Sequence, residues 1–168
     1  MDIIIIEKKQ WDTIEETAKS WNKKAKSYEA SCVNDTPHFF IDSAEITSFI
    51  SSTIEASLSP YGDMIPRSWD TIVTCENISG IQAIALFSEK NLNIISLATN
   101  PDNLPSSLIS SALKTRGAGT KIINYFKEIA EKRDEPLIVE SLERAISFYK
   151  KLGFQEREED APGMSLVM

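Results

Sequence analysis

Three short runs rich in β-branched and apolar residues follow one another along the middle of this 168-residue chain. They cover Thr71 to Glu76, Ile81 to Glu89 and Leu92 to Thr99, and only the polar pair Lys90-Asn91 separates the last two runs. A two-residue polar connection of this kind suits a β-hairpin. The middle of the chain is therefore predicted to form three strands of one sheet, with the last two adjacent and antiparallel.

Segments with helical periodicity lie on both sides of these strands. Before them, the sequence predicts a buried strand at Ile3 to Ile6, and helices at Trp11 to Glu29 and Ala44 to Leu58. After them, it predicts a helix at Gly119 to Arg133, a strand at Leu137 to Ser141, a short helix at Glu143 to Lys151 that stops at Gly153, and one or two strands in the tail, with Ala161-Pro162-Gly163 as a turn. This order predicts a single mixed α/β (α+β) domain with one central sheet.

The composition disfavours several classes of function. Cys32 and Cys75 lie far apart with no further thiols around them, as in a reduced cytosolic protein without a zinc site. His38 is the only histidine, which argues against a histidine-rich metal site, and it is predicted to be a loop residue. The formal charge of -7 disfavours nucleic acid and anionic membranes as partners. The first ten residues resemble neither a secretory signal nor a membrane span, so we expect a soluble, cytoplasmic protein.

One glycine-containing stretch, KTRGAG at residues 114–119, stands directly before the helix predicted from Gly119. It is not a Walker A loop, because Thr120 and Lys121 are in reversed order and no glycine lies five residues before Gly119. It is not a dinucleotide fingerprint either, because the third glycine would have to replace Ile122. Two interpretations remain for the stretch by itself: a plain turn into a helix, or a cradle for a phosphate group.

The segment RAISFYKKLGFQ, residues 144–155, resembles the A-x-x-F-Y-x-x-x-G-F motif of the GNAT superfamily of acyl-CoA-dependent N-acyltransferases. Upstream, Lys114 to Gly119 is similar to the Q/R-x-x-G-x-G/A loop of that superfamily, and LNIISLATNP is similar to the strand before the loop. The resemblance extends from about Ser79 to Phe154, roughly half of the chain. It implies a mostly antiparallel sheet splayed between its fourth and fifth strands, with helices on both faces.

The resemblance also implies an activity, the transfer of an acetyl group from acetyl-CoA to a primary amine of a small molecule or peptide, without a metal. Tyr149 would be the general acid that protonates the leaving thiolate, and it would lie near the coenzyme. Backbone groups of the splayed strand would bind the pantetheine arm, and the loop would bind the pyrophosphate. The residues implied in coenzyme binding are Leu97, Ala98, Thr99, Lys114, Arg116, Gly117, Ala118, Gly119, Thr120, Ser141 and Tyr149.

The sequence departs from the family pattern at several points. The glutamate that serves several members as base is absent from the strand, which begins with Leu92 and Asn93; Glu76, Glu89 and Glu140 remain candidates, as does deprotonation through water. About ten additional residues, 102–113, precede the loop. Lysine replaces glutamine or arginine at the loop's head, and Leu142 replaces a frequent asparagine, so that polar contact would pass to Ser141.

The acceptor side implied by the resemblance is residues 1–69, followed by a coenzyme-binding core at 70–154 and C-terminal strands at 155–168. Six aromatic residues of the acceptor side are candidates for a pocket: Trp21, Tyr28, Phe39, Phe40, Tyr61 and Trp69. The acidic charge favours a small amine or a cationic peptide terminus, and we expect a monomer or homodimer. A non-catalytic acyl-CoA-binding or partner-binding domain is the alternative, whereas the negative charge argues against a toxin that acetylates charged tRNA.

Overall fold

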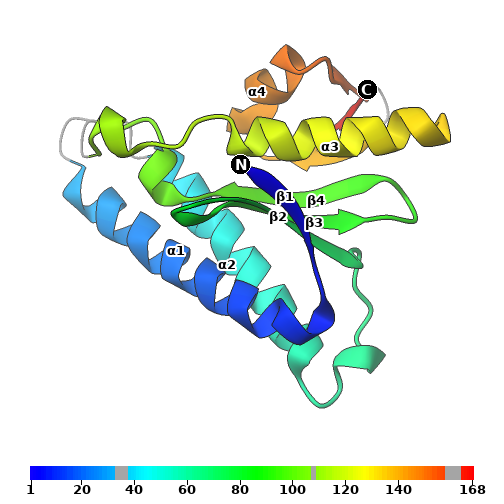
Figure 1. Cartoon of the computed structure of the whole chain (residues 1–168), viewed down its shortest axis with the longest axis horizontal. Coiled ribbons are helices and arrows are strands. Elements are labelled where there is room, and N and C mark those ends of the chain that lie inside the picture. The colour runs from blue at the N-terminus through cyan, green and yellow to red at the C-terminus, as the bar shows by residue number, and fades with distance from the viewer. Residues whose placement is uncertain (33–37, 107–108, 158–163) are drawn as a thin grey trace.

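The computed structural model describes residues 1–32, 38–106, 109–157 and 164–168, and these form a sheet flanked by helices (Figure 1). Within the described residues the sheet has seven strands in the order β1-β2-β3-β4-β5-β7-β6. The strands are β1 (Asp2–Ile6), β2 (Thr71–Asn77), β3 (Gly80–Ser88), β4 (Asn93–Thr99), β5 (Ile138–Ser141), β6 (Gln155–Glu156) and β7 (Met164–Val167). Every neighbouring pair is antiparallel except β4 and β5, which are parallel.

The helices form a layer on each face of the sheet (Figure 1). On one face lie α1 (Trp11–Ser31) and α2 (His38–Leu58), and on the other lie α3 (Ala118–Arg133) and α4 (Ile146–Lys151). The expectation that α2 starts at Ala44 was wrong, because the helix begins six residues earlier and takes in His38, which is therefore no loop residue. None of the helices among the described residues is long and apolar enough to span a bilayer.

Successive side chains along the strands alternate between two separate hydrophobic cores, one on each face of the sheet. Val73 and Cys75 face the core under α3 and α4, whereas Ile72 faces the core under α1 and α2. This follows from the two-residue period of a β-strand, which sends successive side chains to opposite faces of the sheet. The predicted helices and central strands are thus confirmed, and helices cover both faces of the sheet.

The edge strand β1 differs from its prediction. Its strand character is confirmed, but Ile5 is 58% exposed and Ile4 is 38% exposed, so of the four isoleucines only Ile6 is buried. The reason is its position, because β1 pairs only with β2 and forms an edge of the sheet. Four consecutive isoleucines give no alternation from which the exposed side could be recognised.

The parallel contact between β4 and β5 is short. The two strands pair only at Asn93 with Ile138 and at Ile94 with Val139, although β4 continues to Thr99. Beyond Ile94, the described part of the chain offers β4 no strand partner on this side, while pairing with β3 continues to Thr99. The sheet therefore opens between its fourth and fifth strands in sheet order, as the family resemblance implied.

The C-terminal part returns to the sheet after this opening. A short 3-10 helix, Glu143–Ala145, leads into α4, and Gly153 follows with φ of 93°, a conformation that favours glycine after a helix end. The predicted tail strands are confirmed as β6 and β7. The predicted turn at Ala161-Pro162-Gly163 lies outside the described residues.

Candidate functional site

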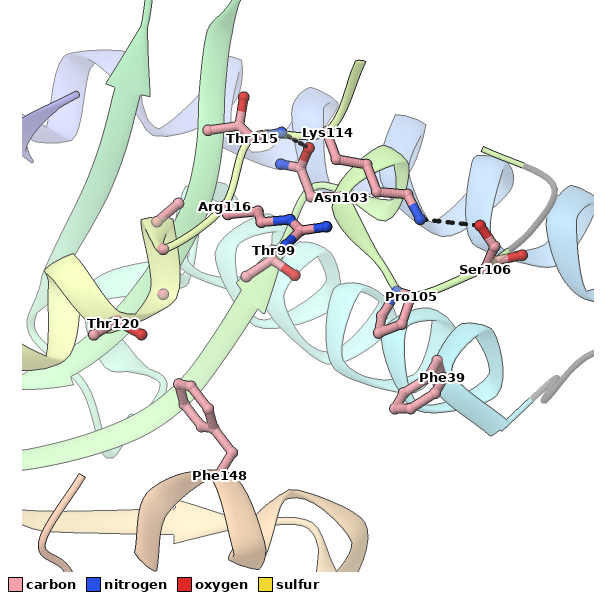
Figure 2. A pocket seen from close by; sticks show the side chains of 13 residues that line it. Phe39, Thr99, Asn103, Pro105, Ser106, Lys114, Thr115, Arg116, Thr120 and Phe148 are labelled. Atoms are coloured by element: carbon pink, nitrogen blue, oxygen red, sulfur yellow. Dashed lines mark hydrogen bonds between the residues drawn. The ribbon is translucent and has the colours of Figure 1, made fainter. Parts of the chain in front are cut away.

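A cavity of about 680 Å³ lies in front of the N-terminus of α3 (Figure 2). Its walls come from the end of β4, the segment before α3, the inserted segment after β4, and the helices α2 and α4. The lining residues are Phe39, Thr99, Asn103, Pro105, Ser106, Lys114, Thr115, Arg116, Gly117, Ala118, Gly119, Thr120 and Phe148. We call this space the loop cavity. It brings together Thr99 and six of the residues implied in pyrophosphate binding, namely Lys114 and Arg116 to Thr120.

The helix terminus at the loop cavity is built to present backbone N–H groups. Gly117 is the N-cap of α3, its φ is 82°, and no side chain caps the helix. A positive φ costs little for glycine alone, which explains a glycine at this position. The amides of Ala118, Gly119 and Thr120 have no carbonyl partner within the helix, because the first intrahelical bond runs from the Lys121 amide to the Gly117 carbonyl (2.9 Å). Such a terminus attracts anions.

Gly119 has no side chain that would fill the base of the loop cavity. A Cβ atom at this position would lie 3.5 Å from Cγ2 of Thr99 and 3.8 Å from Cδ2 of Leu97, both ordinary van der Waals distances. A methyl group there is therefore compatible with the fold, but it would project toward the β4 side chains that border the cavity. The absence of a side chain lets a ligand approach the backbone of the first helical turn.

The two cations of the loop differ in their availability. Nζ of Lys114 donates a hydrogen bond to the carbonyl of Ser106 (2.9 Å), so the lysine is directed along the inserted segment (Figure 2). Arg116 is exposed, and Figure 2 shows its side chain extending into the space between Thr99 and the inserted segment. Of the two cations predicted to add charge at the loop, Arg116 is therefore exposed at the cavity, whereas the ammonium group of Lys114 is already hydrogen-bonded.

The inserted segment contains two short 3-10 helices, Pro101–Asn103 and Ser111–Leu113. Asn103 reaches from the first of them to the loop, where its Oδ1 accepts a hydrogen bond from the Thr115 amide (2.8 Å; Figure 2). Sequence reasoning missed Asn103, because nothing in the pattern around an insertion distinguishes a structural asparagine from a turn residue.

A second cavity of about 650 Å³ lies at the opening between β4 and β5. Its walls come from α2, β4, β5 and α4, and we call it the strand cavity. The lining residues are Glu45, Ile46, Phe49, Asn93, Ile95, Ser96, Leu97, Ile138, Glu140, Ser141, Leu142, Ala145, Tyr149 and Arg157. Leu97, Ser141 and Tyr149, which the resemblance implied in coenzyme binding, meet here, whereas the Ala98 side chain points into the core under α1 and α2.

Tyr149 is the most enclosed polar side chain of the strand cavity. It is 5% exposed and packs edge-on against Phe148 and Phe154, with ring centroids 5.1 and 5.8 Å away. Burial raises the pKa of its phenol above the ordinary value of 10, so the hydroxyl stays protonated at neutral pH. Among the described residues, no side chain or backbone group forms a hydrogen bond with this hydroxyl. The hydroxyl is thus a proton donor on the wall of the strand cavity.

Only one of the three candidate bases lines a cavity. Glu140 borders the strand cavity and accepts a hydrogen bond from Nδ2 of Asn93 (3.1 Å). Glu89 is instead paired with Arg133 (2.8 Å), and Glu76 accepts a hydrogen bond from Thr74 (2.9 Å). A further carboxylate, Glu45, also lines the strand cavity and was not among the predicted candidates.

Most of the six aromatic candidates serve the fold. Trp21, Phe40 and Trp69 are buried, and Tyr28 donates a hydrogen bond to Asp102 (2.6 Å). Tyr61 is largely exposed, so only Phe39 lines one of the two cavities. Aromatic residues at helical spacing thus marked the core more often than a pocket. The described residues also contain no group of three or more metal-binding side chains.

The sequence matches no protein-family model, and none of the curated proteins matches it either. Solved structures do resemble it. The PaiA N-acetyltransferase of Thermoplasma acidophilum in complex with coenzyme A has a TM-score of 0.53 at 12% identity, over 99% of this chain and 98% of that one. A GNAT-family acetyltransferase from Listeria monocytogenes has a TM-score of 0.57 at 10% identity, over 99% and 93%. Together with the opening between β4 and β5 and the uncapped α3 terminus, these likenesses show that the chain has the GNAT acetyltransferase fold.

Proposed function

We propose that this chain is an acetyl-CoA-dependent N-acetyltransferase that binds the coenzyme in the loop cavity and an amine in the strand cavity. One observation carries the proposal: the two cavities share the same two elements. On β4, Thr99 borders the loop cavity and Leu97 borders the strand cavity; on α4, Phe148 and Tyr149 are divided in the same way. A thioester that follows β4 from one cavity to the other would reach the tyrosine.

The residues of the loop cavity fit the anionic part of the coenzyme. Free amides at Ala118 to Thr120, the helix N-terminus and the exposed Arg116 together provide donors and positive charge for a pyrophosphate. Along β4, the backbone groups of Leu97 and Thr99 point away from β3 and have no strand partner within the described residues, which suits hydrogen bonding to the amides of a pantetheine arm, whereas those of Ala98 face Ile84 of β3.

Acetyl-CoA would supply the activated thioester as co-substrate, and no metal is required. In direct transfer within a ternary complex, the amine nitrogen forms a bond to the acetyl carbon, the carbon–sulfur bond breaks, and the nitrogen loses a proton to water or to Glu140. Tyr149 acts as the general acid toward the departing sulfur. Because its raised pKa makes the phenol a weak acid, the hydrogen bond from Tyr149 stabilises the thiolate before the proton moves.

The strand cavity suits a primary amine attached to an aliphatic or peptide chain. Glu45 on α2 and Glu140 on β5 provide negative charge from two different walls, while Ile46, Phe49 and Ile95 provide apolar surface. An alkylammonium ion can contact both, with its charge near the carboxylates and its carbon chain on the apolar wall. In this proposal residues 1–69 supply the acceptor side and residues 70–154 the coenzyme core.

Two measurements test the proposal in sequence. Melting the protein with and without acetyl-CoA tests the loop cavity, and we expect a higher Tm at a coenzyme concentration well above Kd. A screen of small amines and lysine-containing peptides, read by release of free CoA with a thiol reagent, then tests catalysis. Stabilisation without CoA release from any amine would favour the non-catalytic acyl-CoA-binding domain, and no stabilisation at millimolar acetyl-CoA would refute both functions.

A further inference from the structure

We infer that a closed ring of hydrogen bonds through Asn103, Gln82, Asn77 and Thr115 sets the affinity of the loop cavity for coenzyme, with Asn103 and Asn77 as positioning residues. This inference rests on the proposed function, because it assigns the means by which the loop before α3 is held ready for a pyrophosphate. The four side chains come from three separate parts of the chain: the hairpin of β2 and β3, the inserted segment, and the loop itself.

The ring can be followed bond by bond. Oδ1 of Asn103 accepts from the Thr115 amide (2.8 Å), and Nδ2 of Asn103 donates to Oε1 of Gln82 (3.0 Å). Nε2 of Gln82 donates to Oδ1 of Asn77 (3.2 Å), and Nδ2 of Asn77 donates to Oγ1 of Thr115 (3.1 Å). Each of the three side-chain amides thus uses both its oxygen and its nitrogen within the ring.

Backbone groups fix the direction of every amide in the ring. The Thr115 N–H can only donate, so the oxygen of Asn103 must face it. Nε2 of Gln82 also donates to the Gly80 carbonyl (3.1 Å), and Oδ1 of Asn77 also accepts from the Ser79 N–H (2.8 Å). Reversing any one amide would therefore break bonds to both a neighbour and the backbone. Gln82 is only 3% exposed, so such a reversal would leave buried polar atoms unpaired.

Asn103 is itself held from both sides. The short helix Pro101–Asn103 is tied to β3 through the Asn100 amide, which donates to the Gln82 carbonyl (2.9 Å). On the other side, Asp102 accepts hydrogen bonds from Tyr28 (2.6 Å) and Lys24 (2.8 Å) of α1. Burial and the bond to Asp102 raise the pKa of Tyr28 to about 12, so the phenol remains a donor at every physiological pH. The asparagine that positions the loop is thus anchored to the sheet and to α1.

The ring explains how the loop keeps its shape although its first cation is engaged elsewhere. Lys114 is bonded to Ser106, so it does not order the loop around a bound anion. The next residue, Thr115, is held at both its amide and its hydroxyl, directly before Arg116 and the free amides of α3. A ligand that binds a loop already held in place loses less free energy to ordering.

The test compares coenzyme binding by the full chain and three variants, using calorimetric titration with CoA and steady-state kinetics with acetyl-CoA. Asn103→Ala removes two bonds of the ring, and we expect Kd for CoA and KM for acetyl-CoA to rise about tenfold with kcat unchanged. Asn77→Ala is decisive, because Asn77 does not line the loop cavity and so acts on coenzyme only through the loop. For this variant we expect a rise of about fivefold.

Asn22→Ala is the matched control. Nδ2 of Asn22 donates to the Ala44 carbonyl between α1 and α2 (2.6 Å), away from both cavities, so this variant should lower Tm without changing Kd for CoA. If the wild-type chain binds CoA and Asn77→Ala binds it equally well, the inference is wrong while the proposed function stands. If the wild-type chain does not bind CoA, the proposed function itself fails. Should Asn103→Ala not fold, Asn77→Ala alone decides.

Discussion

The two cavities that β4 and α4 border are similar in volume and different in chemistry. The loop cavity is built from backbone amides, Lys114, Arg116 and neutral polar side chains, whereas the strand cavity combines two carboxylates and Arg157 with apolar side chains and a buried phenol. One suits an anion and the other a cation. The net charge of -7 does not predict the ligand preference of either cavity, because a bound ligand responds mainly to the charged groups close to it.

The two cavities also differ in what determines their shape. The loop cavity depends on backbone conformation, through the left-handed Gly117 and the hydrogen-bonded ring. The strand cavity depends on side chains that project from four elements of the sheet and its helices. Substitutions should therefore affect coenzyme and amine independently, and the following predictions test that separation.

The largest effect is expected for Tyr149→Phe. Removal of the hydroxyl should lower kcat about 100-fold, because proton donation to a leaving group contributes on that order, while Kd for CoA changes less than twofold. Since burial raises the phenol's pKa above 10, wild-type turnover should show no loss from phenol ionisation as pH rises from 7 to 9.5. Stopped-flow or steady-state assays across that pH range measure both quantities. Full turnover in the variant would remove the acid role.

Neutralising the carboxylates of the strand cavity should affect the amine alone. For Glu45→Gln and Glu140→Gln we expect KM for a cationic amine to rise about tenfold each, as removal of a charged hydrogen-bonding partner does, with KM for acetyl-CoA unchanged. Glu89→Gln is the control, since Glu89 lies outside both cavities. Equal changes in both KM values would show that the cavities are not independent.

A smaller effect is expected for Gly117→Ala. An alanine at φ of 82° costs about 1–2 kcal/mol even though space around the position is open, so the free energy of unfolding should fall by that amount. Coenzyme affinity should fall as well, because relief of the strain would move the amides of α3. Urea denaturation with and without CoA measures the two effects. Gly153→Ala, another glycine at positive φ that lines neither cavity and takes no part in the ring, controls for strain alone.

The smallest effect is expected for Lys114→Met. Its ammonium group is bonded to the Ser106 carbonyl, so Kd for CoA should rise less than threefold at 0.15 M salt, whereas Arg116→Met should raise it about tenfold. Titration of both variants at two salt concentrations makes the comparison. An equal loss for the two substitutions would mean that both cations reach the ligand.

The fold could be predicted from the sequence wherever periodicity was clear. The hairpin at Lys90-Asn91 and the helix before Arg133 are confirmed, because alternation and helical spacing are local signals. The start of α2 at His38 was missed, since its first turn contains no acidic residue, and the exposure of Ile5 depends on which strand lies at the edge. The exposure of an edge strand depends on the arrangement of the whole sheet, which the sequence of one segment does not show.

The candidate site shows the same division. Gly117 and Tyr149 were named as candidates from two short motifs in a known order, whereas their division between two cavities is visible only in the structure. The motifs could not identify Asn103, Gln82 and Asn77. These polar residues are spread over 27 positions of the chain, and their spacing follows no pattern that would predict a shared ring of hydrogen bonds. Glu45 was likewise not predicted as a site residue, because only the fold brings it to the same cavity as Glu140.

The short pairing between β4 and β5 affects how the protein unfolds. Within the described residues, β4 and β5 pair at only two positions, so few backbone hydrogen bonds protect the sheet at this seam. Local unfolding should start there, with amides of β5 exchanging with solvent sooner than those of β3. A molecule lying between β4 and β5 would bridge the seam, so hydrogen exchange in the C-terminal unit would report occupancy without any assay of turnover.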